Sequence, residues 1–181
     1  MNPVPPLSPC PGRCRAVLRL ALAALPVLLA AAARPPARPP AWVISANENK
    51  LNLASGVTQV VPGAPADTVT FLDFRLFPPA VRHLTHLSNT VLGPPSNVAV
   101  SPDGTLAVIA DSIELDPAQP SGWRPQRRLH LLDLTGPEPR RTGEVEAGEQ
   151  PSGVAFSRDG RQLLVANRAG GSVTAYARDG M

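Results

Sequence analysis

Cysteine is scarce in this chain of 181 residues, which holds only Cys10 and Cys14. If an N-terminal export segment is removed, no cysteine remains for a disulfide framework or a thiolate metal site. The familiar catalytic signatures are also missing: the sequence has no Gly-x-Ser-x-Gly elbow, no Gly-rich phosphate loop and no His-Glu-x-x-His. After the N-terminal segment, no stretch shows helical periodicity over three turns, so we expect an all-β protein.

An excess of charge of one sign is absent once the N-terminal segment is set aside. All 14 acidic residues follow Ala33, while three of the 17 basic residues, Arg13, Arg15 and Arg19, precede it. The remaining chain therefore carries 14 charges of each sign. The pI of about 9.5 reflects the N-terminal segment and does not indicate a nucleic-acid partner.

The first 33 residues have the three parts of a secretory signal peptide. Positive charge precedes an uncharged run, Leu20–Ala33, which ends in four alanines that suit a signal peptidase. This run is shorter than the roughly 20 apolar residues of a membrane span, although an uncleaved anchor stays an alternative. We expect residues 34–40 to be a proline-rich spacer, the protein to be periplasmic or secreted, and no membrane anchor to remain after cleavage.

An internal repeat is the most informative feature of the chain. Residues 95–104, PSNVAVSPDG, match residues 151–160, PSGVAFSRDG, at seven of ten positions. In both copies an apolar segment follows and ends in a polar residue, Asp111 or Asn167, and an earlier copy begins at Trp42 and reaches Asn47. Further strand-like segments follow, at residues 68–74, 128–134 and 172–178, and then at 81–87 and 142–146. Each unit therefore predicts up to four strands.

The strands of a unit differ in polarity in the order expected for a propeller blade. Asp-Gly at 103–104 and at 159–160 predicts a tight turn between the first two strands, with glycine at a positive φ. The first two strands are apolar on both faces, whereas the fourth strands are rich in charged residues and histidine. We therefore predict a β-propeller with blades at about residues 41–92, 93–149 and 150–181.

These residues resemble the YVTN-type β-propeller repeat family, a WD40-like repeat. The resemblance lies in Pro-Ser-x-Val-Ala-x-Ser-x-Asp-Gly followed by an apolar strand ending in Ala-Asn or Ala-Asp, and covers residues 41–180. It implies relatives among periplasmic propellers, propeller-fold lactonases and propeller subunits of quinoprotein dehydrogenases. Because propellers have about four to eight blades, about two and a half blades predict an N-terminal fragment of a larger propeller, with a small barrel as the alternative.

Two connections are longer than the others and are expected to share one rim of the fold. Residues 48–68 and 112–128 follow the second strands of adjacent units, and binding sites tend to lie in such loops on rigid scaffolds. We expect a ligand or partner site there, with Trp123 as a stacking surface or, alternatively, as a hydrophobic plug of its own loop. The candidate residues are Asn49, Lys50, Asp111, Glu114, Trp123, Arg124, Arg127 and Arg128.

Other polar residues are interpreted as structural. Asn47, Asp111 and Asn167 recur in every unit, which favours caps of the following loop over a ring of ligand-binding groups. His83 and His86 are three apart on a strand and point to opposite faces, so we expect no metal site. No catalytic residue or cofactor is assigned.

Two hypotheses on function follow. The first is an exported binding or scaffold protein whose partner is an unknown small molecule or protein and which is not an enzyme. The second is a lactonase-type hydrolase, or a propeller subunit of a quinoprotein dehydrogenase, with part of its active site in further blades.

Overall fold

The alternating apolar residues of the repeat form strands, as the sequence predicts. The computed structural model describes residues 42–90, 92 and 96–178; within these residues the protein is all-β and contains no helix, so none that could cross a membrane. The predicted signal peptide and spacer lie outside the described residues. The strands are β1 (Trp42–Asn47), β2 (Leu51–Asn52), β3 (Gln59–Val60), β4 (Thr68–Asp73), β5 (Ala80–Thr85), β6 (Val98–Val100), β7 (Leu106–Leu115), β8 (Trp123–Asp133), β9 (Arg140–Glu146), β10 (Pro151–Phe156), β11 (Gln162–Asn167) and β12 (Ser172–Ala177).

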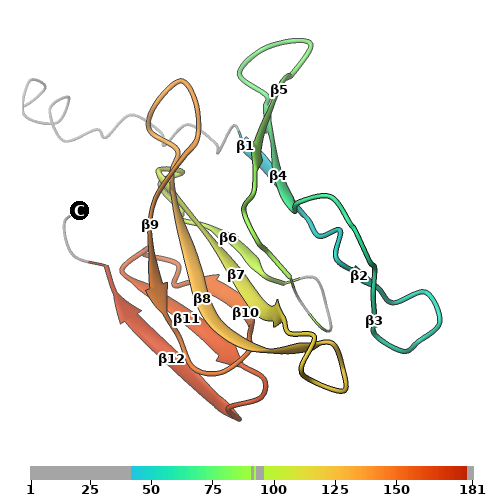
Figure 1. Ribbon diagram of the computed structural model, residues 1–181. Coiled ribbons are helices and arrows are strands. Elements are labelled where there is room, and N and C mark those ends of the chain that lie inside the picture. Colours follow the sequence, from blue (N-terminus) through green and yellow to red (C-terminus); the bar gives the residue numbers. More distant parts are fainter. Residues whose placement is uncertain (1–41, 91, 93–95, 179–181) are drawn as a thin grey trace, which may run out of the picture. The chain divides into compact units, whose positions relative to one another are not determined.

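The strands form three antiparallel sheets and one small hairpin (Figure 1). Strands β6, β7, β8 and β9 pair in chain order to make a four-stranded sheet. The orders of the two flanking three-stranded sheets are β1-β4-β5 and β10-β11-β12. Strands β2 and β3 form a separate hairpin within the connection from β1 to β4.

The two Asp-Gly turns have the same geometry, which explains the sequence repeat. The amide of Gly104 donates to the carbonyl of Ser101 at 2.8 Å, and the amide of Gly160 donates to the carbonyl of Ser157 at 2.9 Å. Both glycines have a φ of 71°. A side chain is strained at this φ, so glycine is required where the turn closes each hairpin.

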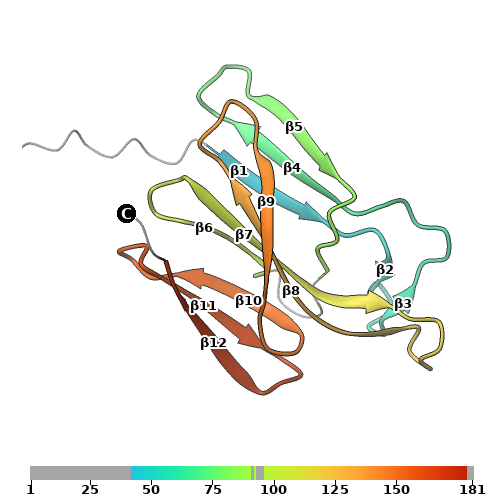
Figure 2. The same ribbon diagram turned by 60° about the vertical axis from the view of Figure 1, so that its left-hand side comes forward.

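The four-stranded sheet is covered on both faces by the flanking sheets (Figure 2). One face packs Ile109 and Leu132 against Val69 and Phe71 of the β1-β4-β5 sheet. The other face packs against the β10-β11-β12 sheet, and the buried residues there include Val108, Leu129, Val154 and Val165. This double cover explains why residues 107–113 of β7 are all buried.

Strand β11 departs from the predicted burial. The sequence predicts burial on both faces, but buried and exposed residues alternate along β11. Leu164 is 44% exposed and Val173, on β12, is 67% exposed, because no sheet covers this face among the described residues. The fourth strands β5 and β9 contain no buried residue, which confirms their predicted polar character.

The connection predicted at residues 112–128 is mostly strand. Strands β7 and β8 continue as a long hairpin up to the pair of Leu115 with Trp123, so only residues 116–122 form the connecting loop. Pro125 made this segment resemble a loop in the sequence. Pro125 pairs with Ile113 of β7 and precedes the part of β8 that pairs with β9, which begins at Arg128. Only one neighbouring strand is therefore present at this proline, as at the edge of a sheet.

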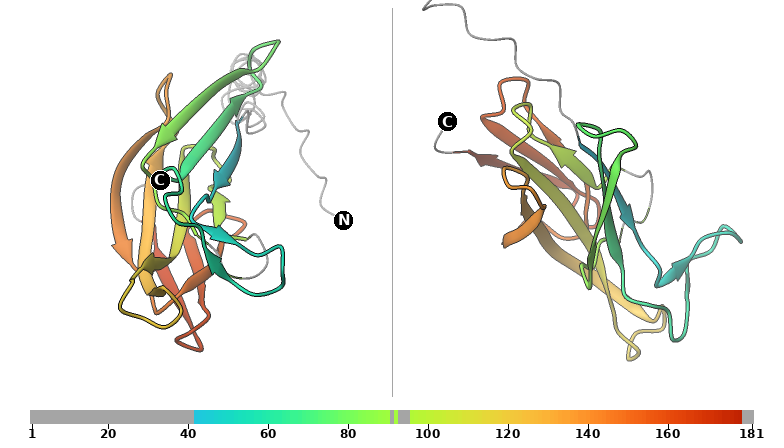
Figure 3. Two further views of the ribbon diagram at one scale, coloured as in Figure 1. Left: turned by 45° about the vertical axis from the view of Figure 1, so that its right-hand side comes forward. Right: turned by 90° about the horizontal axis from the view of Figure 1, so that it is seen from above.

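The two long connections contact each other, as their predicted position on one rim requires. Leu51 of β2 and Ile113 of β7 share a small buried cluster with Leu92, and Val60 and Trp123 pack against it. The β2-β3 hairpin and the tip of the β7-β8 hairpin lie at the same end of the sheets in every view (Figures 1 and 3).

Candidate functional site

The polar residue that ends the second strand of each unit has a structural role in the two flanking sheets. Asn47 Nδ2 donates to Thr70 Oγ1 at 2.9 Å, and Asn167 Nδ2 donates to Thr174 Oγ1 at 2.8 Å. Each asparagine therefore binds a hydroxyl on the neighbouring third strand. The prediction that these residues cap the backbone of the following loop is wrong in this detail, although the bonds do hold two adjacent strands together.

The middle sheet replaces this arrangement with charged groups. Asp111 takes the place of the asparagine, and Arg128 lies directly opposite it in the register. In the flanking sheets the residues opposite the asparagines are Thr68 and Ser172. Two positions further along the third strand, His130 takes the place of the bonded threonine. The middle unit therefore has Asp, Arg and His where its neighbours have Asn, a hydroxyl residue and Thr.

Asp111 is 1% exposed and is held by three different segments of the chain. Ser88 Oγ donates to its Oδ1 at 3.0 Å, and Arg128 Nη1 lies 3.7 Å from its Oδ2. Burial raises the pKa of the Asp111 carboxyl, while Lys50, the Ser88 hydroxyl and Arg128 oppose this increase. The group is thus more readily protonated than an exposed aspartic acid.

Lys50 extends this network to the connection before β4. Its ammonium group forms an ion pair with the Asp67 carboxylate and donates to Ser88 Oγ at 2.9 Å. Asp67 is held in place by the backbone amides of Asn49, at 3.0 Å, and Asn89, at 3.2 Å. A continuous chain of hydrogen bonds therefore runs from Asp67 to Asp111.

His130 holds the segment that carries Ser88. Its Nε2 lies 2.9 Å from the carbonyl oxygen of Ser88, so Nε2 carries the hydrogen and donates. His130 is 2% exposed, and its Nδ1 has no partner among the described residues. Burial, followed by the positive charges of Arg141 and Arg128, lowers the pKa of the His130 imidazole to about 4. The ring is therefore neutral near pH 7.

An open groove of about 300 Å³ lies over this network. It is lined by Lys50, Ser88, Asp111, Ile113, Glu114, Leu115, Gln126 and Arg128. A second hollow of about 350 Å³ shares Lys50, Ser88 and Leu115 with the first and adds Ala64, Pro65, Ala66, Asp67 and His86. The lining of the two hollows thus combines charged groups with the apolar side chains of Leu115, Ala64 and Pro65.

Two acidic residues of β7 line the groove next to a β-bulge. The register between β7 and β8 shifts between Asp111 and Ile113, because β8 has one more residue than β7 in this stretch. Such a bulge increases the local twist of the hairpin. Asp111 and Glu114 both line the groove here.

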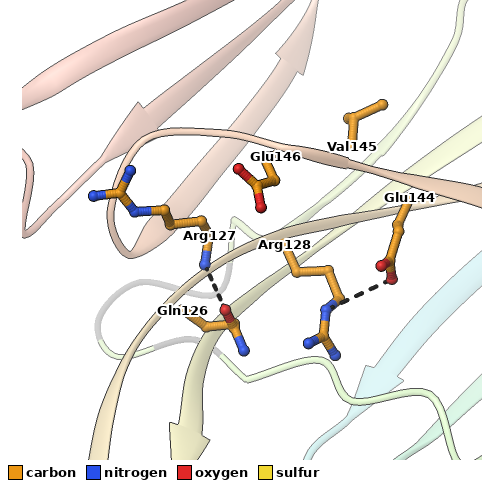
Figure 4. Close-up of a pocket in the computed structure, with 6 residues that line it drawn as sticks. All are labelled: Gln126, Arg127, Arg128, Glu144, Val145 and Glu146. Carbon is orange, nitrogen blue, oxygen red and sulfur yellow. Dashed lines mark hydrogen bonds and ion pairs between the residues drawn. The ribbon is translucent and has the colours of Figure 1, made fainter.

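The guanidinium of Arg128 has two carboxyl groups nearby but no hydrogen bond to either. It lies 3.7 Å from Asp111 and 3.6 Å from Glu144, and it makes no hydrogen bond to any of the described residues. It also lines a neighbouring pocket of about 280 Å³ with Gln126, Arg127, Glu144, Val145 and Glu146 (Figure 4). Arg128 therefore reaches both hollows with its hydrogen-bond donors available.

The structure brings together four of the eight residues predicted for the site, namely Lys50, Asp111, Glu114 and Arg128. Arg124 is exposed and forms ion pairs with Glu114 and, at 3.8 Å, with Asp116. Trp123 packs against the small cluster of Leu51, Leu92 and Ile113, which supports its interpretation as a plug. The two others lie outside this groove: Asn49 bonds Asp67 and the carbonyl of Ala66, and Arg127 lines the pocket of Figure 4.

Sequence reasoning missed Asp67, Ser88, Gln126 and the part played by His130. A comparison of the repeat units at the third strand could have found His130, because its neighbours carry threonine at that position. Nothing in the sequence marks Ser88 or Asp67, which lie in irregular connections. Among the described residues, no group of three or more His, Cys, Asp or Glu side chains is placed to hold a metal ion.

A comparison with solved structures supports the β-rich fold through one similar chain, that of hydrazine synthase. No protein-family model and no curated protein matches the chain. A chain of hydrazine synthase from Kuenenia stuttgartiensis is similar in structure, with a TM-score of 0.50 and 16% identity over 77% of this chain. A functionally unknown protein from Desulfotomaculum acetoxidans gives a TM-score of 0.39 and 16% identity over 75% of this chain. The matches cover 42% and 41% of those two chains.

Proposed function

We propose that this chain is an exported binding protein, periplasmic or secreted, in which the three sheets are consecutive blades of a β-propeller. In this proposal the groove over Lys50, Ser88, Asp111 and Arg128 is the ligand site. Support for export comes from the sequence of the first 33 residues, which has the charge and apolar pattern of a signal peptide.

The uncovered face of the β10-β11-β12 sheet supports the propeller. Leu164 and Ala166 of β11 correspond in the repeat to Val108 and Ala110 of β7, which are fully buried against the next sheet. The exposed face thus has the same apolar character as a face that is covered by a sheet of the same repeat. A further blade packed in the same way would bury it.

The observation that carries the functional proposal is the break in the repeat at Asp111, Arg128 and His130. A residue that serves the fold recurs in each unit, as Asn47 and Asn167 do. The middle unit instead buries a carboxyl with a raised pKa beside a guanidinium that makes no hydrogen bond to a described residue, and both line a groove. A buried ionisable group of this kind destabilises the fold and is typical of functional sites.

One contact favours the alternative of a lactonase-type hydrolase. The Ser88 hydroxyl donates to the Asp111 carboxylate, as a nucleophile would to a base. Against this, Lys50 is ion-paired with Asp67 and donates to the same hydroxyl, so it cannot accept its proton. We therefore favour binding without catalysis. The Ser88→Ala variant distinguishes the two hypotheses, because it would abolish any turnover but would only weaken binding.

Fragment screening by NMR on the full chain tests the proposed site. We expect small polar fragments to shift the amide resonances of Lys50, Ser88 and Asp111. A triple variant gives the middle unit the residues of the flanking units: Asp111→Asn, Arg128→Ser and His130→Thr. This variant is expected to fold and to lose these shifts. Fragments that cluster elsewhere, or that bind equally to the restored variant, would contradict the proposal.

A further inference from the structure

Arg128 provides the first part of an anion site within the groove. Its guanidinium has five N–H donors, and none makes a hydrogen bond to a described residue. The planar fork of arginine matches the two oxygens of a carboxylate, and such paired, charge-assisted bonds are stronger than neutral ones. Asp111 and Glu144 lie at 3.7 Å and 3.6 Å, which holds the guanidinium in place without occupying its donors.

Lys50 provides the second part. One of its three N–H groups goes to Asp67 and one to Ser88, and the third has no hydrogen-bond partner among the described residues. Its side chain is only 12% exposed, so a ligand in the groove would meet a largely desolvated ammonium group. Electrostatic interactions are stronger in such surroundings than at an exposed lysine.

The charge balance of the network sets the charge of the ligand. Ion pairs and hydrogen bonds connect three cations and three carboxyl groups here: Lys50, Arg128 and Arg141 with Asp67, Asp111 and Glu144. This network is neutral when all six are charged. If the most buried carboxyl, that of Asp111, takes up a proton, the network has one positive charge in excess. One negative charge on the ligand restores neutrality, whereas a dianion does not.

Three segments surround the Asp111 carboxyl. Lys50 faces it from the connection after β1, Ser88 and the backbone of Thr90 from the segment after β5, and Arg128 from β8. An anion placed on Arg128 and Lys50 would weaken the attraction that keeps Asp111 ionised. Protonation of Asp111 and anion binding should therefore favour each other.

Part of the remaining lining is apolar. Leu115 is 41% exposed and lines both hollows, and Ala64 and Pro65 line the second one. These side chains would cover the hydrocarbon part of a ligand whose charged group lies at Arg128.

We propose that the groove binds a small monocarboxylic acid with an apolar body, held by Arg128 and Lys50, and that Asp111 takes up a proton from solvent on binding. The inference rests on the proposed function, because it uses the same groove. It adds the chemical class of the ligand and a coupling to pH.

NMR titration of the full chain with benzoate and hexanoate tests this proposal, with benzamide as the neutral match of benzoate and inorganic phosphate as a second anion. We expect saturable shifts at Arg128 and Ser88 with the two carboxylates, and tighter binding at pH 5 than at pH 8. Arg128→Ser should weaken binding about tenfold or more. Asp111→Asn should keep binding and remove its pH dependence.

The control is Arg127→Ser, because Arg127 is exposed and does not line this groove. It should leave binding of benzoate unchanged. If benzamide bound in the groove as tightly as benzoate, the inference would be overturned and the proposed function would stay intact. Tighter binding of phosphate would overturn the assignment to monocarboxylic acids. If none of these probes shifts the groove while fragments bind elsewhere, both proposals fail.

Discussion

Gly122, in the loop between β7 and β8, lies against Val60 of the β2-β3 hairpin. A Cβ atom at Gly122 would come within 2.9 Å of Val60 Cγ2, and Gly122 has a φ of 76°. Two separate features therefore require glycine here.

Gly122→Val is expected to destabilise the protein at least as much as Gly104→Val, by about 1–3 kcal/mol. Both residues have a positive φ, but a Cβ at Gly104 would meet nothing within 4 Å. Gly143→Val is the control, since Gly143 lies in β9 with open space around it and no positive φ. Urea unfolding of the three variants measures the difference, and a smaller loss at Gly122 than at Gly104 would contradict the packing against Val60.

Trp123→Ala is expected to lower the free energy of unfolding by about 2 kcal/mol, because it removes a partly buried ring from the cluster with Leu51 and Ile113. Trp123→Phe should retain most of this stability. Arg124→Ala, in contrast, removes only surface ion pairs, with Glu114 and Asp116, and should cost less than about 1 kcal/mol. Thermal unfolding compares the three, and equal losses for Trp123→Ala and Arg124→Ala would show that Trp123 is not a plug.

Asp111→Asn is expected to make the protein more stable than wild type at pH 7. The pKa of Asp111 is raised in the folded state, so its contribution to stability is complete below the ordinary value of 3.8 and is lost as the pH rises through the folded pKa. The difference in free energy of unfolding between the variant and wild type should therefore become smaller as the pH falls towards 4. Urea unfolding of both proteins at several pH values measures this difference.

Asp159→Asn provides a control of opposite sign. Hydrogen bonds from Ser157 and the amide of Arg161 lower the pKa of Asp159, so its contribution is present at pH 7 and is lost in acid. This variant should be less stable than wild type at neutral pH. An Asp111→Asn variant that behaves in the same way would show that Asp111 is stabilised as a carboxylate.

In the His130→Thr variant, the free energy of unfolding is expected to fall less between pH 6.5 and pH 4 than it does in wild type. The pKa of buried His130 is lowered to about 4, so the unfolded chain binds the proton more readily than the folded protein does. The stability that His130 contributes is complete above 6.5 and is lost as the pH falls, on the order of 3 kcal/mol in total. Urea unfolding of wild type and His130→Thr at several pH values measures the difference, and parallel pH profiles for the two proteins would contradict the lowered pKa of His130.

Leu164→Lys is expected to be tolerated in this chain, whereas Val108→Lys at the equivalent position of β7 should prevent folding. Leu164 is 44% exposed, while Val108 is fully buried between two sheets. If further blades follow in a longer protein, Leu164→Lys should become strongly destabilising there, by several kcal/mol. Circular dichroism and thermal unfolding of both variants, in both contexts, distinguish an open face from one covered by a further blade.

Local patterns in the sequence determined much of the strand arrangement. Turn closure at Gly104 and Gly160 depends on neighbouring residues only, and the alternation of apolar residues has the period of a strand. The polar fourth strands could also be predicted, because a charged face needs no partner to be recognised. Lys50, Asp111 and Arg128 could also be named as candidates from the sequence, because they lie in or next to the connections that follow the second strands.

Only the tertiary structure decided how these candidates combine. Lys50 and Ser88 are 38 residues apart, and Ser88 and Asp111 are 23 apart, so their contacts depend on how one sheet packs on the next. That Glu114 lines the same groove as Asp111 depends on the hairpin of β7 and β8, which Pro125 concealed in the sequence. The strands follow from local sequence, whereas the groove follows from packing between distant segments, because burial and side-chain pairing are properties of the folded chain alone.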